Sequence, residues 1–231
     1  MSETWLLIET SGRTGRAGLA RNGEVIRTRT LAETRRLARD LAPSIAEMLN
    51  EERLEPRDVA GVMVSVGPGS YTGLRVGIAS AKAFAYATGC PLIAVPTFSA
   101  ISQEVPDLAC ETWVIADALQ GLVYLQRYRH AKPLDALRIA AASEALAAVP
   151  AHVWLAGPGL ATFKLNDAGL VPEPSLEGVL RAGSGIGPAS RETLFALEPL
   201  YLRGSSAEEK ADTARAGNAP PSARSGGASD S

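Results

Sequence analysis

The sequence predicts an α/β protein built from two related lobes. Expected strands and helices follow in the order β-β-β-α-β-α-β-α, and a second section continues as β-β-α-β. Two local signals support this order. Asn22-Gly23 between two strand-like runs is typical of a hairpin turn, and a glycine-rich loop separates an apolar run from a helix. With 231 residues and an apolar fraction of 46%, the chain is long enough to bury a core.

The chain opens with three expected antiparallel strands. Residues 5–10 are apolar and β-prone, and the runs at 17–20 and 24–31 flank the predicted hairpin turn. At the end of the first strand stand Glu9, Ser11 and Gly12. A tight turn there can wrap a phosphate, although an ordinary β-turn is the preferred interpretation.

A helix is predicted over residues 34–54. Large apolar residues recur in it at helical spacing, and they are Leu37, Leu41, Ile45, Met48 and Leu49. Pro43 lies inside this pattern, where it either kinks the helix or begins a second one, because proline lacks an amide donor.

The next elements form a strand, loop and helix. Residues 59–67 are continuously apolar, as expected of a strand covered on both faces. After the loop, residues 74–89 predict a helix that ends at Gly89. A buried strand at 91–96 and a short helix at 97–105 follow, with Thr97 as the expected N-cap.

The loop itself reads SVGPGSYTGLRVG over residues 65–77. A strand, a glycine-rich loop and a helix start can bind an anion, but the lysine of a P-loop is missing and the glycines are spaced GxGxxxG. The alternative is a turn that lets helix and strand pack closely. The candidate cofactor-binding residues are Ser11, Gly12, Gly67, Gly69, Ser70, Thr72 and Gly73.

The second half predicts strands at 111–118 and 121–129, a helix at 143–149 and a strand at 152–159. Turns and short helices are expected from 170 to 197. After Arg203 the chain has no aromatic or large aliphatic residue, which predicts disorder. The expected organisation is therefore a first lobe at 1–105 with partner-binding helices, a smaller second lobe at 106–203 and a disordered tail at 204–231.

Composition narrows the function classes. A net charge of −2 gives no overall attraction to nucleic acid, although five arginines between 27 and 39 lie close in sequence. The two cysteines and two histidines lack metal-ligand spacing, so no metal site is expected. The first residues resemble a strand and not a signal peptide, and no apolar run reaches the roughly 18 residues of a membrane span. A cytoplasmic, reduced protein is expected.

Three stretches resemble the TsaB (YeaZ) family. They are WLLIETSGRTGRAGLARNGEVI at 5–26, GPGSYTGLRVGIASAKAFAYATGCPLIAVPTFSA at 67–100 and PLYLR at 199–203. The resemblance implies an actin-like/Hsp70-like ATPase (ASKHA) fold with two similar lobes. It also implies a role in making N6-threonylcarbamoyladenosine at position 37 of tRNAs that read codons beginning with A.

In that family the TsaB member is the non-catalytic scaffold. Its paralogue TsaD holds the metal and transfers the threonylcarbamoyl group, the ATPase TsaE joins the pair, and TsaB forms homodimers without its partner. The resemblance therefore implies no catalytic residue and no cofactor of this chain's own, with ATP or ADP at the partner interface and only indirect contact with tRNA. The helices at 33–50 and 75–88 would form that interface, and its candidate residues are Leu37, Leu41, Arg75, Ile78, Ala81, Lys82 and Ala85.

Three positions depart from the family pattern. Glu9 stands where the family usually has aspartate, which moves the carboxylate by about one bond length. The usual histidine-serine pair before the first long helix is replaced around Arg36-Leu37, and Asp117-Ala118-Leu119 lacks the usual arginine. These departures put nucleotide binding by this chain alone in doubt.

Two other functions remain as alternatives. A small-molecule kinase of the same superfold needs an aspartate base and complete phosphate-binding turns in both lobes, and AGPGLATF at 156–163 is a candidate second turn. A peptidase would need a serine, a histidine and an acid in one place, and the sequence shows no such set at a recognisable spacing.

Overall fold

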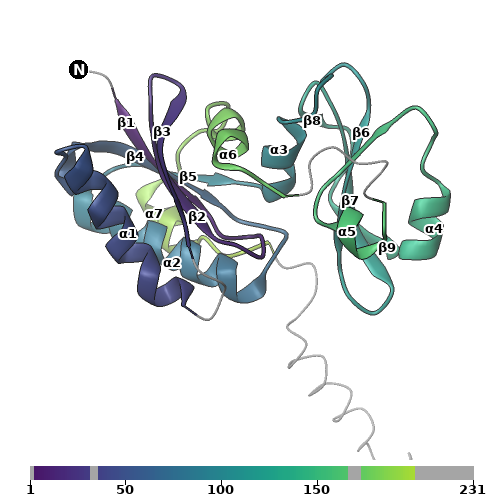
Figure 1. Ribbon diagram of the computed structural model, residues 1–231, viewed down its shortest axis with the longest axis horizontal. Helices are drawn as coiled ribbons and strands as arrows, with labels where there is room; N and C mark the ends of the chain where they lie inside the picture. The colour runs from purple at the N-terminus through teal and green to yellow at the C-terminus, as the bar shows by residue number, and fades with distance from the viewer. Residues whose placement is uncertain (1–2, 32–35, 166–172, 201–231) are drawn as a thin grey trace, which may run out of the picture.

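The computed structural model describes residues 3–31, 36–165 and 173–200, which form two α/β lobes, each with a five-stranded sheet (Figure 1). The predicted tail at 204–231 lies outside these residues. The strands and helices are β1 (Thr4–Glu9), β2 (Arg16–Arg21), β3 (Glu24–Thr30), α1 (Leu37–Glu51), a 3₁₀ turn (Pro56–Asp58), β4 (Val59–Ser65), α2 (Tyr71–Thr88), β5 (Leu92–Val95), α3 (Thr97–Ser102), β6 (Thr112–Asp117), β7 (Leu122–Arg129), β8 (Lys132–Pro133), β9 (Arg138–Ala141), α4 (Ala142–Ala147), β10 (Trp154–Ala156), α5 (Gly159–Thr162), α6 (Leu176–Gly183) and α7 (Arg191–Ala196).

The first sheet has the strand order β3-β2-β1-β4-β5. β1, β4 and β5 are parallel, whereas β2 pairs antiparallel with both β1 and β3. Asn22 and Gly23 have φ angles of 55° and 81°, which are the left-handed angles that a two-residue hairpin turn requires. The predicted opening hairpins are therefore confirmed.

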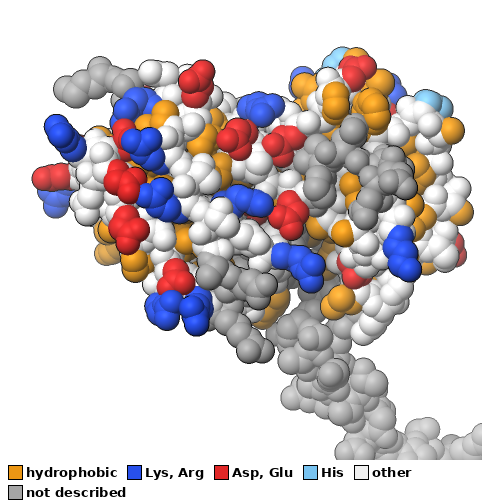
Figure 2. All heavy atoms as spheres, viewed as in Figure 1, with side chains coloured by type: hydrophobic (Ala, Val, Ile, Leu, Met, Phe, Trp, Pro, Cys, Tyr) orange, Lys and Arg blue, Asp and Glu red, His pale blue; other side chains and the backbone are white. Residues whose placement is uncertain are grey.

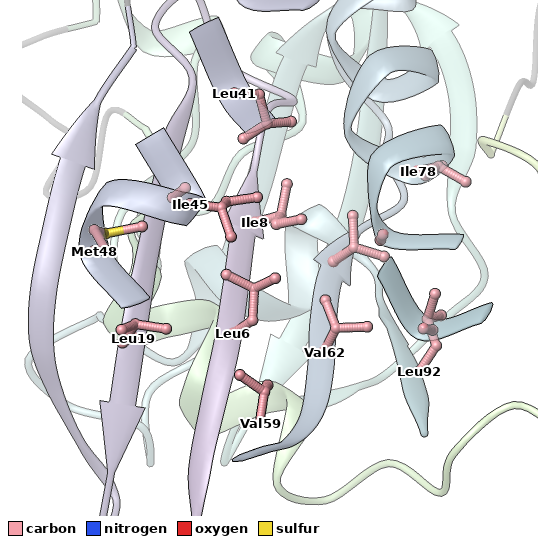
Figure 3. Packing of buried hydrophobic residues seen from close by; sticks show 14 of the residues in the cluster. Leu6, Ile8, Leu19, Leu41, Ile45, Met48, Val59, Val62, Ile78 and Leu92 are labelled. Atoms are coloured by element: carbon pink, nitrogen blue, oxygen red, sulfur yellow. The ribbon is translucent and has the colours of Figure 1, made fainter. Parts of the chain in front are cut away.

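Helices α1 and α2 cover one face of this sheet, and α6 covers the other (Figure 1). Side chains alternate between the faces of a strand, so Leu6 and Ile8 of β1 meet α1 and α2 while Leu7 meets α6. Figure 3 shows Leu41, Ile45 and Met48 of α1 directed at the strands, as their helical spacing predicts. The core of the first lobe thus lies on both sides of β1.

The second sheet has the order β10-β6-β7-β8, with β9 also paired to β7. α3 packs on one of its faces through Phe98 and Ile101, and α4 and α5 pack on the other. α3 belongs by sequence to the expected first lobe, yet its apolar side chains lie in the core of the second.

α6 and α7 fall within the expected second lobe by sequence, but in the structure they pack on the first lobe. Leu176 and Val179 of α6 pack on one face of the first sheet. Leu194 of α7 packs on the opposite face, together with α1. A Cβ at Gly18 would overlap the side chain of Leu176, so the glycine leaves room for α6 on β2. The chain therefore crosses to the second lobe and returns to the first.

Two local expectations are corrected. No second helix begins at Pro43, because α1 continues through it; Pro43 is exposed, so water can hydrate the carbonyl that loses its amide partner. Thr97 is not an N-cap: the helix begins after Pro96, and the Thr97 hydroxyl accepts the Gly67 N–H at 3.1 Å instead.

The arginines on β2 and β3 pair with the end of α1. Arg27 lies 2.8 Å from a carboxylate oxygen of Glu52, Arg21 also reaches Glu52, and Arg29 pairs with Glu51. Figure 2 shows the interleaved basic and acidic side chains on this face of the first lobe. Arg27 and Arg29 of the arginine-rich segment are thus neutralised locally, which favours a solvated ion-pair surface over a phosphate-binding patch.

Candidate functional site

The first candidate site lies where β1 ends. Glu9 is completely buried, and its Oε1 accepts hydrogen bonds from the Ser11 amide at 2.6 Å and the Ser11 hydroxyl at 2.5 Å. Its Oε2 has no hydrogen-bond partner among the described residues. Burial raises the pKa of the Glu9 carboxyl, and the hydrogen bonds from Ser11 oppose that rise. The geometry suits a carboxyl group that carries a proton more readily than usual.

The glycine-rich loop lies directly against this turn. The Ser70 amide donates to the Ser11 carbonyl at 2.7 Å, and the Ser70 hydroxyl accepts the Gly73 amide at 3.2 Å as the N-cap of α2. A Cβ on Gly69 would overlap the Ser11 carbonyl, and one on Gly73 would overlap the Thr10 carbonyl. The glycines therefore allow β1 and the start of α2 to approach closely.

The structure brings together most of the predicted cofactor-binding residues. The amides of Gly67, Ser70 and Gly73 all donate within the chain, so these three groups are not free for a phosphate. This arrangement favours the close-packing interpretation of the loop. Gly12 is half-buried on the far side of the Ser11 turn, and Thr72 is exposed in the first turn of α2.

Two turns of the second lobe are closed by contacts within the chain, and one of them, at 156–163, is the candidate second phosphate-binding turn of a kinase. Asp117 accepts the Leu119 amide at 2.7 Å, which closes a local turn. Gly157 has a φ of 103°, and a Cβ there would overlap the Ile115 carbonyl of β6. Both turns thus have internal packing or hydrogen-bonding roles.

Five of the predicted interface residues are corrected by their burial. Leu37, Leu41, Ile78, Ala81 and Ala85 are each at most 3% exposed and pack in the core of the first lobe. Side chains with so little surface cannot contact a partner directly. Their apolar spacing marks the inner faces of α1 and α2, since an amphipathic helix turns its apolar stripe to its own core.

The outer face of α2 carries a different set of residues. Arg75 is exposed and Lys82 is half-buried, so these two predicted positions remain at the surface. Beside them lie the exposed Ala79, Ala83, Tyr86 and Ala87. We call these four residues the outer α2 face.

An aromatic pair borders the outer α2 face. Tyr86 and Phe195 of α7 are 65% and 60% exposed, and their rings form an edge-to-face pair at 5.7 Å. Lys82 donates a 2.9 Å hydrogen bond to the Phe195 carbonyl, which holds α7 beside α2. This pair was not predicted, because its only sequence signal is a tyrosine on α2 outside the apolar stripe.

The described residues hold neither a metal-binding cluster nor a membrane-spanning helix. Within them, no group of three or more histidine, cysteine, aspartate or glutamate side chains is placed to hold a metal ion. Over the same residues, no helix has the length and apolar character needed to cross a membrane.

The buried carboxyl makes a testable prediction about pH. Because the pKa of Glu9 is raised in the folded chain, the charged form destabilises the fold, and stability from this site falls as pH rises through the folded value. Glu9→Gln stays neutral. Its free energy of unfolding relative to wild type should therefore increase as the pH is raised above 4.5, the ordinary pKa of the carboxyl group, as measured by urea denaturation. The measurement at the lowest pH, where Glu9 is protonated in both the folded and the unfolded chain, is the internal control. A difference in free energy of unfolding between the variant and wild type that does not change with pH would contradict the prediction.

Comparisons with known proteins identify the family of the chain. The family model described as TsaD, tRNA N6-adenosine threonylcarbamoyltransferase, matches residues 25–182. An uncharacterized protein of Mycobacterium tuberculosis is 33% identical over 87% of this chain and 92% of its own length. The tRNA threonylcarbamoyladenosine biosynthesis protein TsaB of Bacillus subtilis is 30% identical over 55% of this chain and 56% of its own.

Among solved structures, YeaZ from Pseudomonas aeruginosa has a TM-score of 0.69 at 20% identity, covering 87% of this chain and all of that one. A second Pseudomonas aeruginosa structure, described as similar to peptidase YeaZ, has a TM-score of 0.72 at 22% identity over 87% of this chain and all of its own. These likenesses confirm the two-lobed α/β fold, which the chain shares with the YeaZ structures. The family model spans more than half of the chain, and the chain therefore belongs to the TsaD family, within which it is a TsaB (YeaZ) homologue.

Proposed function

We propose that this chain takes part in making N6-threonylcarbamoyladenosine in tRNA, as the non-catalytic partner of a TsaD-type transferase. Its family membership and its TsaB relatives support the pathway. The internal hydrogen bonds of the Gly67, Ser70 and Gly73 amides support a scaffold role, because they occupy groups that a phosphate-transferring enzyme would aim at its substrate.

The observation that carries the proposal is the outer α2 face. Exposed alanines one turn apart let a partner helix approach closely, and the exposed Tyr86–Phe195 pair supplies aromatic surface of the kind that anchors protein interfaces. A TsaD-type paralogue suits this face, since it belongs to the same family. Relatives described as tRNA N6-adenosine threonylcarbamoyltransferase match 50–52% of this chain.

The remaining family features are part of the same proposal. A TsaE-type ATPase joins the pair, the chain forms a homodimer when the transferase is absent, and ATP or ADP binds at the interface with the partner. tRNA is held mainly by the transferase. No comparable observation favours the small-molecule kinase, whose candidate turn at 156–163 packs against β6.

Complementation tests this function. A bacterial strain depleted of its own TsaB receives this chain together with the TsaD-type paralogue from the same source, and modified nucleoside in bulk tRNA is quantified by mass spectrometry. We expect N6-threonylcarbamoyladenosine to return only when both proteins are present. Full expression of folded protein without any modified nucleoside would contradict the proposal, and ATP turnover by the purified chain alone would favour the kinase.

A further inference from the structure

α3 is the element at which the two lobes meet. Its Phe98 and Ile101 lie in the core of the second lobe, whereas Ala100 packs among the apolar residues of α6 and the first sheet. Figure 1 shows α3 and α6 side by side between the two lobes. A Cβ at Gly178 of α6 would overlap the Ala100 carbonyl, so the glycine lets these two helices approach closely. The contact between α3 and α6 is therefore a boundary between the lobes.

The N-terminal end of α3 is fixed to the first lobe. The Thr97 amide donates to the Gly67 carbonyl at 2.8 Å, and the Thr97 hydroxyl accepts the Gly67 amide at 3.1 Å. Both residues are buried, so water does not compete for these two hydrogen bonds. This end of α3 is therefore a fixed point relative to the first sheet.

The C-terminal end of α3 is held by side-chain contacts with α6. Glu104, two residues beyond the helix, accepts a hydrogen bond from the Ser175 hydroxyl at the N-cap of α6. Arg181 of α6 donates to the Gln103 carbonyl at 3.1 Å. At helical rise, the seven residues from Thr97 to Glu104 correspond to about 10 Å. These contacts thus hold α3 at the end away from its fixed point.

The bond between Glu104 and Ser175 leaves one carboxyl oxygen unsatisfied. Glu104 Oε2 is buried, and it has no hydrogen-bond partner among the described residues. Burial raises the pKa of Glu104, and the hydrogen bond from Ser175 opposes that rise. Two charged groups face the carboxyl, both from α6: Arg181 lowers its pKa and Glu177 raises it. The contact therefore holds a protonated carboxyl better than a charged one, since an unsatisfied buried charge is costly.

We propose that Glu104 and Ser175 form a latch between the two lobes. While the latch is closed, the second lobe is held against α6. When the Glu104 carboxyl loses its proton, the latch opens, water hydrates the carboxylate, and α3 turns about its Thr97 end together with the second lobe. Because the folded pKa is raised, the closed form is favoured at low pH and is lost as the pH rises through that pKa.

The competing explanation is a permanent tie, which stabilises the contact between α3 and α6 and never opens in the folded chain. The two explanations differ in what they predict for the distance between the lobes. A tie keeps one distance at every pH, whereas a latch gives a second distance once the carboxyl is charged.

The distance between two spin labels, measured by electron paramagnetic resonance, tests the latch. The labels are attached at Glu47→Cys on α1 of the first lobe and Glu144→Cys on α4 of the second lobe, two exposed positions. The full chain is used, with its own cysteines replaced by Cys90→Ala and Cys110→Ser. As the pH is raised above 4.5, the ordinary pKa of the carboxyl group, the share of molecules at a second distance should grow at least about threefold. A distance distribution that does not change with pH would overturn the inference.

Two further variants and a control locate the effect. Glu104→Gln stays neutral and still accepts a hydrogen bond from Ser175, so its distance distribution should not change with pH. Glu104→Ala cannot close the latch and should show the second distance at every pH. Glu24→Ala removes an exposed glutamate of β3 and should behave like the wild type. A pH response that persists in Glu104→Gln, or a single distance in a Glu104→Ala chain that is folded by circular dichroism, would equally contradict the latch.

Discussion

Gly73→Ala is expected to lower the free energy of unfolding by about 3 kcal/mol. The added Cβ would overlap the Thr10 carbonyl oxygen and would lie 3.1 Å from the Ser70 hydroxyl oxygen. The first of these atoms belongs to the backbone at the end of a central strand, so it cannot rotate away. Either β1 or the start of α2 must shift, and that shift weakens the bonds between Ser11, Ser70 and Gly73. Urea denaturation of the purified chain measures the loss.

Gly187→Ala is the control for this prediction. A Cβ at Gly187 has no heavy atom within 4 Å, so the substitution should change stability by no more than about 0.5 kcal/mol. If Gly73→Ala is tolerated equally well, the loop has room that the structure does not show. The glycine would then more plausibly serve the approach of a ligand than the packing of α2 against β1.

Local patterns in the sequence predicted much of the first lobe. The apolar run of β1 and the helical spacing within α1 depend only on neighbouring residues, and both are confirmed by the burial of Leu6, Ile8 and Leu41. The hairpin at Asn22-Gly23 is equally local, because its left-handed backbone angles favour those two residue types.

The docking of α6 could not be predicted in this way. Its apolar residues indicate a helix. They do not indicate which of the two sheets the helix covers once the chain has passed through the second lobe. The information lies in a pair of positions far apart in sequence: Gly18 has no side chain, and Leu176 fills the space that this leaves. A single sequence contains both residues without showing that they meet.

The error over the partner surface has a related cause. Small and apolar residues of α2 were assigned to an interface, whereas Ala81 and Ala85 complete the core of the chain itself. A helix on the surface of a sheet needs its regular apolar stripe for that sheet. Residues available to a partner lie on the opposite face, where Tyr86 and Ala83 stand. A bulky charge at Ala81 or Ala85 would therefore disrupt the fold before it tested binding.

Ala83→Arg is expected to weaken binding of the TsaD-type paralogue about hundredfold. Ala83 lies on the outer α2 face between Ala79 and Ala87, where a partner helix would approach most closely. An arginine there separates the two surfaces and leaves an unpaired charge within the contact. The chain itself should keep its stability, because the position is exposed and arginine is a good helix former. Isothermal titration with the purified paralogue measures the change.

Ala147→Arg on α4 of the second lobe separates a local effect from a general one. It adds the same charge at another exposed helical alanine, so the two variants differ only in the surface that they alter. Affinity lost by Ala83→Arg and kept by Ala147→Arg would locate the transferase on the outer α2 face. Equal binding by both would move the interface elsewhere. Equal loss would mean that added positive charge, and not the packing of helices, controls the association.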